Sequence, residues 1–131
     1  MNNFLIIPCE VASKSVVPAI KALMAKELVE KHGLKQDKVA EILGMSQSAV
    51  SKYTQKVRGY VIRIDNIEGI QPLISKMIGL LMDETYPRRE FLIFFCQTCK
   101  TIRRTKLMCP FCQKAESRIN IEECSLCLTS I

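Results

Sequence analysis

Residues 36–56 read QDKVAEILGMSQSAVSKYTQK, and this stretch decides the fold of the first half of the chain. Its apolar residues recur at helical spacing on both sides of Gly44: Val39, Ala40, Leu43, Ala49, Val50 and Tyr53. Gly44 is a turn residue, and Ser46 is a good N-cap for a second helix. The pattern predicts two short helices that cross at a three-residue turn.

Such a crossing makes a separate demand on each of three positions. Ala40 must be small where the helices touch, Gly44 must turn left-handed, and Val50 must wedge the two helices together. This is the helix-turn-helix arrangement. Its alternative is a helical pair that packs for structure alone or binds protein. The absence of Asp and Glu from Ile42 to Ile64 favours DNA.

From Leu34 to Arg58 the chain resembles the Xre-type helix-turn-helix family, the lambda repressor and Cro class. The residues that carry the resemblance stand at that family's spacing: Gln36, Ala40, Gly44 and Val50. The segment SQSAVSKY is similar to its recognition helix. The preceding PCEV segment and VVPAIKALMAKELVEKHGL resemble a group of archaeal predicted regulators, in which a Pro-Cys-Glu segment and a long first helix precede the motif.

A second motif helix of this kind enters the major groove of DNA. Its outward side chains then face base edges, where Gln47 can pair with adenine and Lys52 with guanine. Gln36 is placed for a phosphate contact by the family resemblance. Lys56 and Arg58 would follow the DNA backbone and give affinity without sequence information. The full set of expected DNA-binding residues is Gln36, Ser46, Gln47, Ser48, Ser51, Lys52, Gln55, Lys56 and Arg58.

Helical patterns flank this motif. Before it, a helix with Pro18 in its first turn and an apolar stripe is expected, with Ile20, Leu23, Met24 and Leu28 on the stripe. After it, one helix face is expected from about Asp65, disturbed at Pro72 and carrying Ile70, Ile74, Met77, Ile78 and Leu81. Tyr60 to Ile64 is a short strand or an extended link. A further helix opens at Pro87. The surplus apolar surface predicts a homodimer, since two recognition helices one DNA turn apart read a palindrome.

The strongest chemical signal is Cys96-x2-Cys99-x9-Cys109-x2-Cys112. Two Cys-x-x-Cys pairs can complete a tetrahedral zinc site, and CPFC resembles a zinc-ribbon knuckle. An iron–sulfur cluster on the same four residues is the alternative, and a thioredoxin-like dithiol is a more remote one. A third pair, Cys124 and Cys127, would replace one of these pairs, join a second metal across a dimer or act as a redox pair. Cys9 is expected to be a buried small hydrophobe.

Composition restricts the remaining choices. The net charge is +6, and the sequence offers no signal peptide, no membrane-length apolar run and no catalytic constellation. We therefore expect a cytoplasmic protein that is not an enzyme and does not engage a membrane; nothing points to a particular small-molecule effector.

The expected fold is mainly α. It comprises a helix-turn-helix DNA-binding domain (1–60), a helical linker or dimerisation region (61–95) and a small Cys-rich metal-binding region (96–131). The leading function is a dimeric, sequence-specific transcriptional regulator that binds double-stranded DNA. The alternative is a zinc-bearing protein-interaction module, such as an antitoxin or an accessory of the transcription machinery.

Overall fold

The computed structural model describes residues 5–54 and 62–128. The fold is mainly α-helical, as the sequence predicts, and no strand occurs within those two ranges. Helices α1 (Pro8–Lys14) and α2 (Val16–Glu30) come first, and α3 (Gln36–Leu43) and α4 (Gln47–Thr54) follow. Helices α5 (Ile70–Leu81), α6 (Arg88–Arg103) and α7 (Cys109–Ala115) and the 3-10 turn η1 (Leu126–Leu128) complete the order. No described helix is long and apolar enough to cross a membrane.

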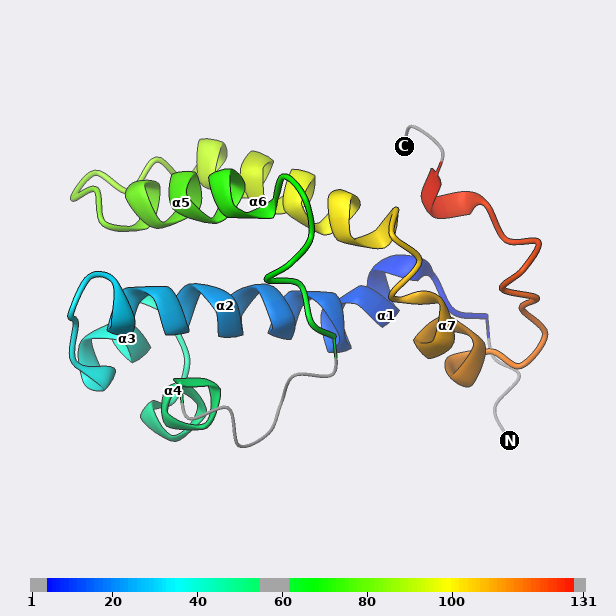
Figure 1. The fold of residues 1–131 in the computed structure, drawn as a ribbon, viewed down its shortest axis with the longest axis horizontal. Coiled ribbons are helices and arrows are strands. Elements are labelled where there is room, and N and C mark those ends of the chain that lie inside the picture. Colours follow the sequence, from blue (N-terminus) through cyan, green and yellow to red (C-terminus); the bar gives the residue numbers. More distant parts are fainter. Residues whose placement is uncertain (1–4, 55–61, 129–131) are drawn as a thin grey trace.

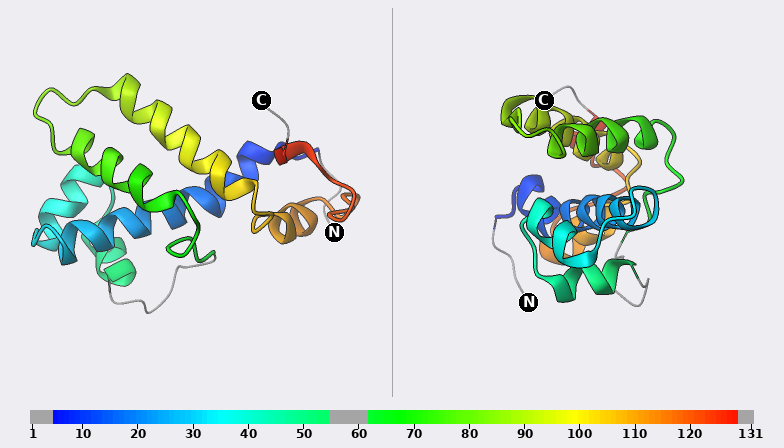
Figure 2. Two further views of the ribbon diagram at one scale, coloured as in Figure 1. Left: turned by 45° about the horizontal axis from the view of Figure 1, so that its top comes forward. Right: turned by 90° about the vertical axis from the view of Figure 1, so that its left-hand side faces the viewer.

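Helix α2 is the axis of the molecule (Figure 1). The hairpin of α5 and α6 lies along one side of it, and α3 and α4 lie on the other side near its C-terminal end. Helices α1 and α7 and the C-terminal segment gather at the opposite end, a separation that is also clear in a second view (Figure 2). The molecule is therefore elongated, with the short helix pair at one end and the cysteine-rich tail at the other.

The predicted stripe of α2 is confirmed, because Ile20, Leu23, Met24 and Leu28 are all buried. They join one apolar core with buried residues from the other regions, among them Val39, Val50, Ile74 and Ile102. The three expected regions thus share a single core. Their boundaries stay a prediction, although α6 runs without interruption across the one placed between residues 95 and 96.

The start predicted for α5 is wrong. The helix begins at Ile70 rather than near Asp65, because a turn closed by the Ile67 N–H on the Ile64 carbonyl (3.1 Å) comes first. Gly69 then ends that turn in a left-handed conformation, with φ at 86°. Pro72 consequently falls in the first turn of α5, where its missing N–H costs nothing, and it does not disturb the helix. Ile70, Ile74, Met77 and Ile78 are buried as predicted.

The link before α5 begins with a bend at Ile62 in its described part, residues 62–64, and forms no strand there. Ile62 and Ile64 are both buried and so fasten the link to the core. The second half of the hairpin, α6, follows Pro87 as expected. Its buried residues are Phe91, Thr98 and Ile102, which recur at helical spacing. This register fixes which face of α6 is turned toward the core.

Candidate functional site

The turn between α3 and α4 is built as the sequence predicts. Gly44 adopts φ 65° and ψ 38°, the left-handed conformation that closes α3. The Met45 N–H donates to the Ala40 carbonyl at 3.0 Å and seals the turn. At the start of α4, the Ala49 N–H donates to Ser46 Oγ at 3.1 Å, so Ser46 is the N-cap.

Val50 is the wedge of the motif and is completely buried. Both α3 and α4 pack against α2, so the pair is held by a third helix and does not hang from a linker. Gln36 is half-buried, and its Nε2 donates to Thr54 Oγ1 at 3.5 Å, joining the start of α3 to the end of α4. The rest of the chain therefore fixes the orientation of α4.

The opposite face of α4 carries the expected DNA-binding residues. Ser46, Gln47, Ser48 and Lys52 are exposed, and Ser51 is half-buried. Gln55, Lys56 and Arg58 lie outside the described residues. Helix α4 contains no Asp or Glu, so its outer face offers hydrogen-bonding groups and one positive charge. A face of this kind can meet base edges and phosphates without repelling them.

Residues 26–59, about a quarter of the chain, match the family model described as Helix-turn-helix. This stretch is a helix-turn-helix domain. The match supports the Xre-type resemblance and, in general terms, a DNA-binding regulator. Comparison with curated proteins gave no match, and comparison with solved structures gave none either.

The six paired cysteines fall into two groups at the far end of the molecule. Cys109, Cys112, Cys124 and Cys127 line one apolar pocket of about 230 Å³, together with Arg103 and residues of the N-terminal segment. Cys96 and Cys99 lie on α6 and are not part of its lining. The structure therefore places the second and third Cys-x-x-Cys pairs around one pocket, and of the first pair only Cys99 comes near it, through Arg103.

Electrostatics reports the same grouping. Burial first, and then the charges of Cys127, Cys109 and Cys124, raise the pKa of the Cys112 thiol to about 11 against the opposing charge of Arg103. Burial also raises the pKa of Cys109, with Cys124 and Cys127 adding to the effect.

The first pair has different neighbours. Burial raises the pKa of Cys99, Arg103 lowers it, and the remaining contributions come from Cys9 and Cys96. Cys9 is exposed, so its expected burial is wrong. It occupies the second position of α1, and it is Val11 and Ala12 that this helix turns inward.

Arg103 connects α6 to the tail. Its Nε donates to Cys127 Sγ at 3.4 Å, and its side chain is half-buried. Burial alone would lower the pKa of Arg103, but its interactions with Cys127 and Cys99 outweigh that effect and raise it. A guanidinium held in this way supplies positive charge to the thiols.

The donor set of this pocket fits a thiophilic metal, since two Cys-x-x-Cys pairs offer four soft sulfur ligands. All seven cysteines are free thiols. Within residues 5–54 and 62–128, no three His, Cys, Asp or Glu side chains already stand close enough together to hold an ion. The tail would therefore have to move for its four sulfurs to reach one metal.

Proposed function

We propose that this protein is a sequence-specific, DNA-binding transcriptional regulator that acts as a dimer and carries a metal in its C-terminal region. The observation that carries the proposal is the construction of α4. One face is anchored in the core by Val50, and the other exposes Gln47, Ser48 and Lys52 beside a capped N-terminus. A recognition helix needs one face packed firmly on the core and an exposed polar face that can contact DNA.

The roles of the individual residues follow from their chemistry. Gln47, in the first turn of α4, would pair with adenine, and Lys52 would reach guanine. Gln36 would contact a phosphate while its bond to Thr54 keeps it in place. Lys56 would contribute affinity without sequence preference. Gln36, Ser46, Ser48, Ser51, Gln55 and Arg58 complete the proposed contact set.

The test is binding to a randomised DNA pool, followed by anisotropy titrations on the selected site. Gln47→Ala should lose about 1–3 kcal/mol of discrimination at one base pair. Gln71→Ala is the matched control, since it removes the same side chain from an exposed position in the first turn of α5. Lys56→Ala should weaken binding to all sequences about equally. Steeply salt-dependent binding with no preferred sequence would replace this proposal with the protein-interaction module.

Dimerisation is supported by the outer face of the hairpin. Leu92 and Ile93 are 39% and 42% exposed on α6, and Met82 and Tyr86 are exposed nearby in the chain. Exposed apolar residues so close together favour a partner surface. A dimer would present two α4 helices, one to each half of a palindromic site.

Zinc is the metal that the paired thiols favour, and it would stabilise a tail that has little core of its own. The alternative is an iron–sulfur cluster, which would make the tail a sensor of oxygen or iron. Metal analysis with an absorption spectrum on protein purified without oxygen distinguishes them. One zinc in a colourless solution supports the first, and iron with sulfide and visible absorbance supports the second.

A further inference from the structure

We propose that the metal ligands are Cys109, Cys112, Cys124 and Cys127, and that Cys96 and Cys99 stand outside the site. This inference rests on the metal part of the proposed function and replaces the ligand set expected from sequence spacing. Its basis is the shared pocket: all four residues line it, and neither Cys96 nor Cys99 does. The spacing becomes Cys-x2-Cys-x11-Cys-x2-Cys.

Each of the two chosen pairs lies on or next to a short turn. Cys109 and Cys112 span the first turn of α7, where the Cys112 N–H donates to the Met108 carbonyl at 3.2 Å. Cys127 lies within the 3-10 turn η1, which the Leu128 N–H closes on the Ser125 carbonyl at 3.0 Å, and Cys124 comes just before this turn. A turn of this kind lets two thiolates approach one ion from the same side.

The first pair is fixed on a core helix, where Cys99 contacts Arg103 and Cys96 stays outside the pocket lining. Cys96 is exposed on a helix that continues to Arg103, and Thr98 and Ile102 on the same helix are completely buried. The Thr98 hydroxyl is further bonded to the Phe94 carbonyl at 2.7 Å. Turning Cys96 toward Cys112 would pull Thr98 and Ile102 out of the core, so the helix that carries the first pair resists joining the site.

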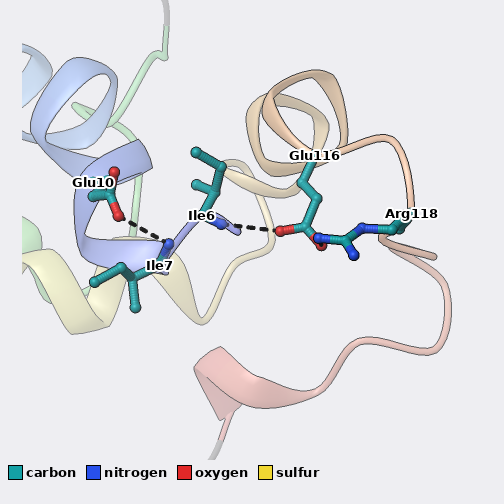
Figure 3. A network of polar contacts seen from close by, with 5 residues as sticks. All are labelled: Ile6, Ile7, Glu10, Glu116 and Arg118. Atoms are coloured by element: carbon teal, nitrogen blue, oxygen red, sulfur yellow. Dashed lines mark hydrogen bonds and ion pairs between the residues drawn. The ribbon is translucent and has the colours of Figure 1, made fainter. Parts of the chain in front are cut away.

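The segment that carries the third pair is held less firmly, because no residue from 117 to 128 is buried. Between the end of α7 and η1 the described chain contains only turns and extended residues. Its start is held by Glu116, which accepts the Ile6 N–H at 3.0 Å and pairs with Arg118 at 3.0 Å (Figure 3). Beyond Glu116 this segment has no buried residue to withdraw from the core, and the Arg103–Cys127 bond keeps its end beside α6, so a movement of its two thiols toward α7 would leave the core intact.

The charges around the pocket also suit four thiolates. A divalent ion with four thiolate ligands carries a net charge of −2. Arg103 and Lys106 both line the pocket and supply two positive charges, and Arg103 already donates to Cys127. Partners of this kind orient metal ligands and balance their charge.

The experiment is cobalt(II) titration of the full chain without oxygen, read by absorption and by native mass spectrometry. We expect wild type and Cys96→Ser/Cys99→Ser to bind one cobalt with the charge-transfer bands of four thiolates. Cys124→Ser/Cys127→Ser should lose stoichiometric binding. Because that variant could misfold, Cys127→His is the second test: it should keep one cobalt, with weaker thiolate bands, since imidazole can replace one thiolate in such sites.

Two results would overturn the assignment. One is loss of cobalt from Cys96→Ser/Cys99→Ser with retention by Cys124→Ser/Cys127→Ser, and the other is retention by both. Failure of the metal proposal itself looks different, because wild type would then bind no cobalt. Failure of the DNA proposal would appear only in the DNA titrations, which are carried out on the wild-type chain separately from the cobalt titrations.

Discussion

The turn of the helix-turn-helix allows a prediction in which one substitution has opposite effects at two sites. Gly44 has φ 65°, and a methyl group there would meet no atom within 4 Å. Gly79 lies within α5 in ordinary helical backbone, exposed, and also with no atom within 4 Å of an added methyl. Since an added methyl group clashes at neither site, the backbone conformation alone decides whether alanine raises or lowers the free energy of unfolding.

The magnitudes follow from that geometry. Alanine in the left-handed region costs about 1–2 kcal/mol. Its lower entropy in the unfolded chain returns about 0.4–1 kcal/mol. Gly44→Ala should therefore lower the free energy of unfolding by about 1 kcal/mol. Gly79→Ala should raise it by about 1 kcal/mol, the difference between the two residues in a helix interior.

The assay is urea unfolding followed by far-UV circular dichroism, with the metal content held constant. Gly44→Asn is the matched control, because asparagine tolerates the left-handed region. It should lower the free energy of unfolding by less than Gly44→Ala does. A loss above about 3 kcal/mol for Gly44→Ala would mean that the turn is crowded. No loss would mean that the residue is not left-handed. A destabilising Gly79→Ala would reveal a partner packed on that face of α5.

Three further outcomes are expected. Val50→Ala removes two buried carbon atoms and should lower the free energy of unfolding in urea by about 2–3 kcal/mol. This exceeds the transfer free energy of the lost atoms because a cavity is expected to remain between the helices. Replacing Leu92 and Ile93 together by Glu should convert a dimer to a monomer in light scattering; an unchanged mass would refute the proposed interface. In metal-free protein at pH 8, the Cys112 pKa of about 11 leaves about a hundredfold less thiolate than the ordinary value of 9.0. Its alkylation should therefore be slow, should speed up as pH rises toward 11, and should lose its protection in urea.

Much of the helical fold could be predicted from local pattern. The short helices of the motif, their turn and the N-cap follow from Gly44, Ser46 and the apolar spacing around them. The inner face of α5 follows in the same way, since Ile70, Ile74 and Met77 recur at helical spacing. These features depend on residues within one or two turns of each other, where sequence is a sufficient guide.

The features that local pattern leaves undecided depend on contacts between distant residues. Which Cys-x-x-Cys pairs meet is set by the packing of α6 against the core and by the path of the tail past Glu116, and spacing records neither. One signal was available: Phe91, Thr98 and Ile102 keep helical register through the first pair and so mark it as part of a core helix. The exposure of Cys9 likewise follows from which side of α1 packs, a choice that seven residues leave open.

The position of α2 couples the stability of one end of the molecule to that of the other. Its 15 residues span about 22 Å, so an ion bound at the tail, as proposed, would lie far from any base that α4 would contact. Yet α2 packs against both α4 and α6, and a single core contains residues of all three. If that core melts in one transition, ligand binding at the tail raises the unfolding temperature of the DNA-reading end as well. Loss of the proposed ion would then reduce the fraction of folded molecules that can bind the operator, with no change in the residues that contact it.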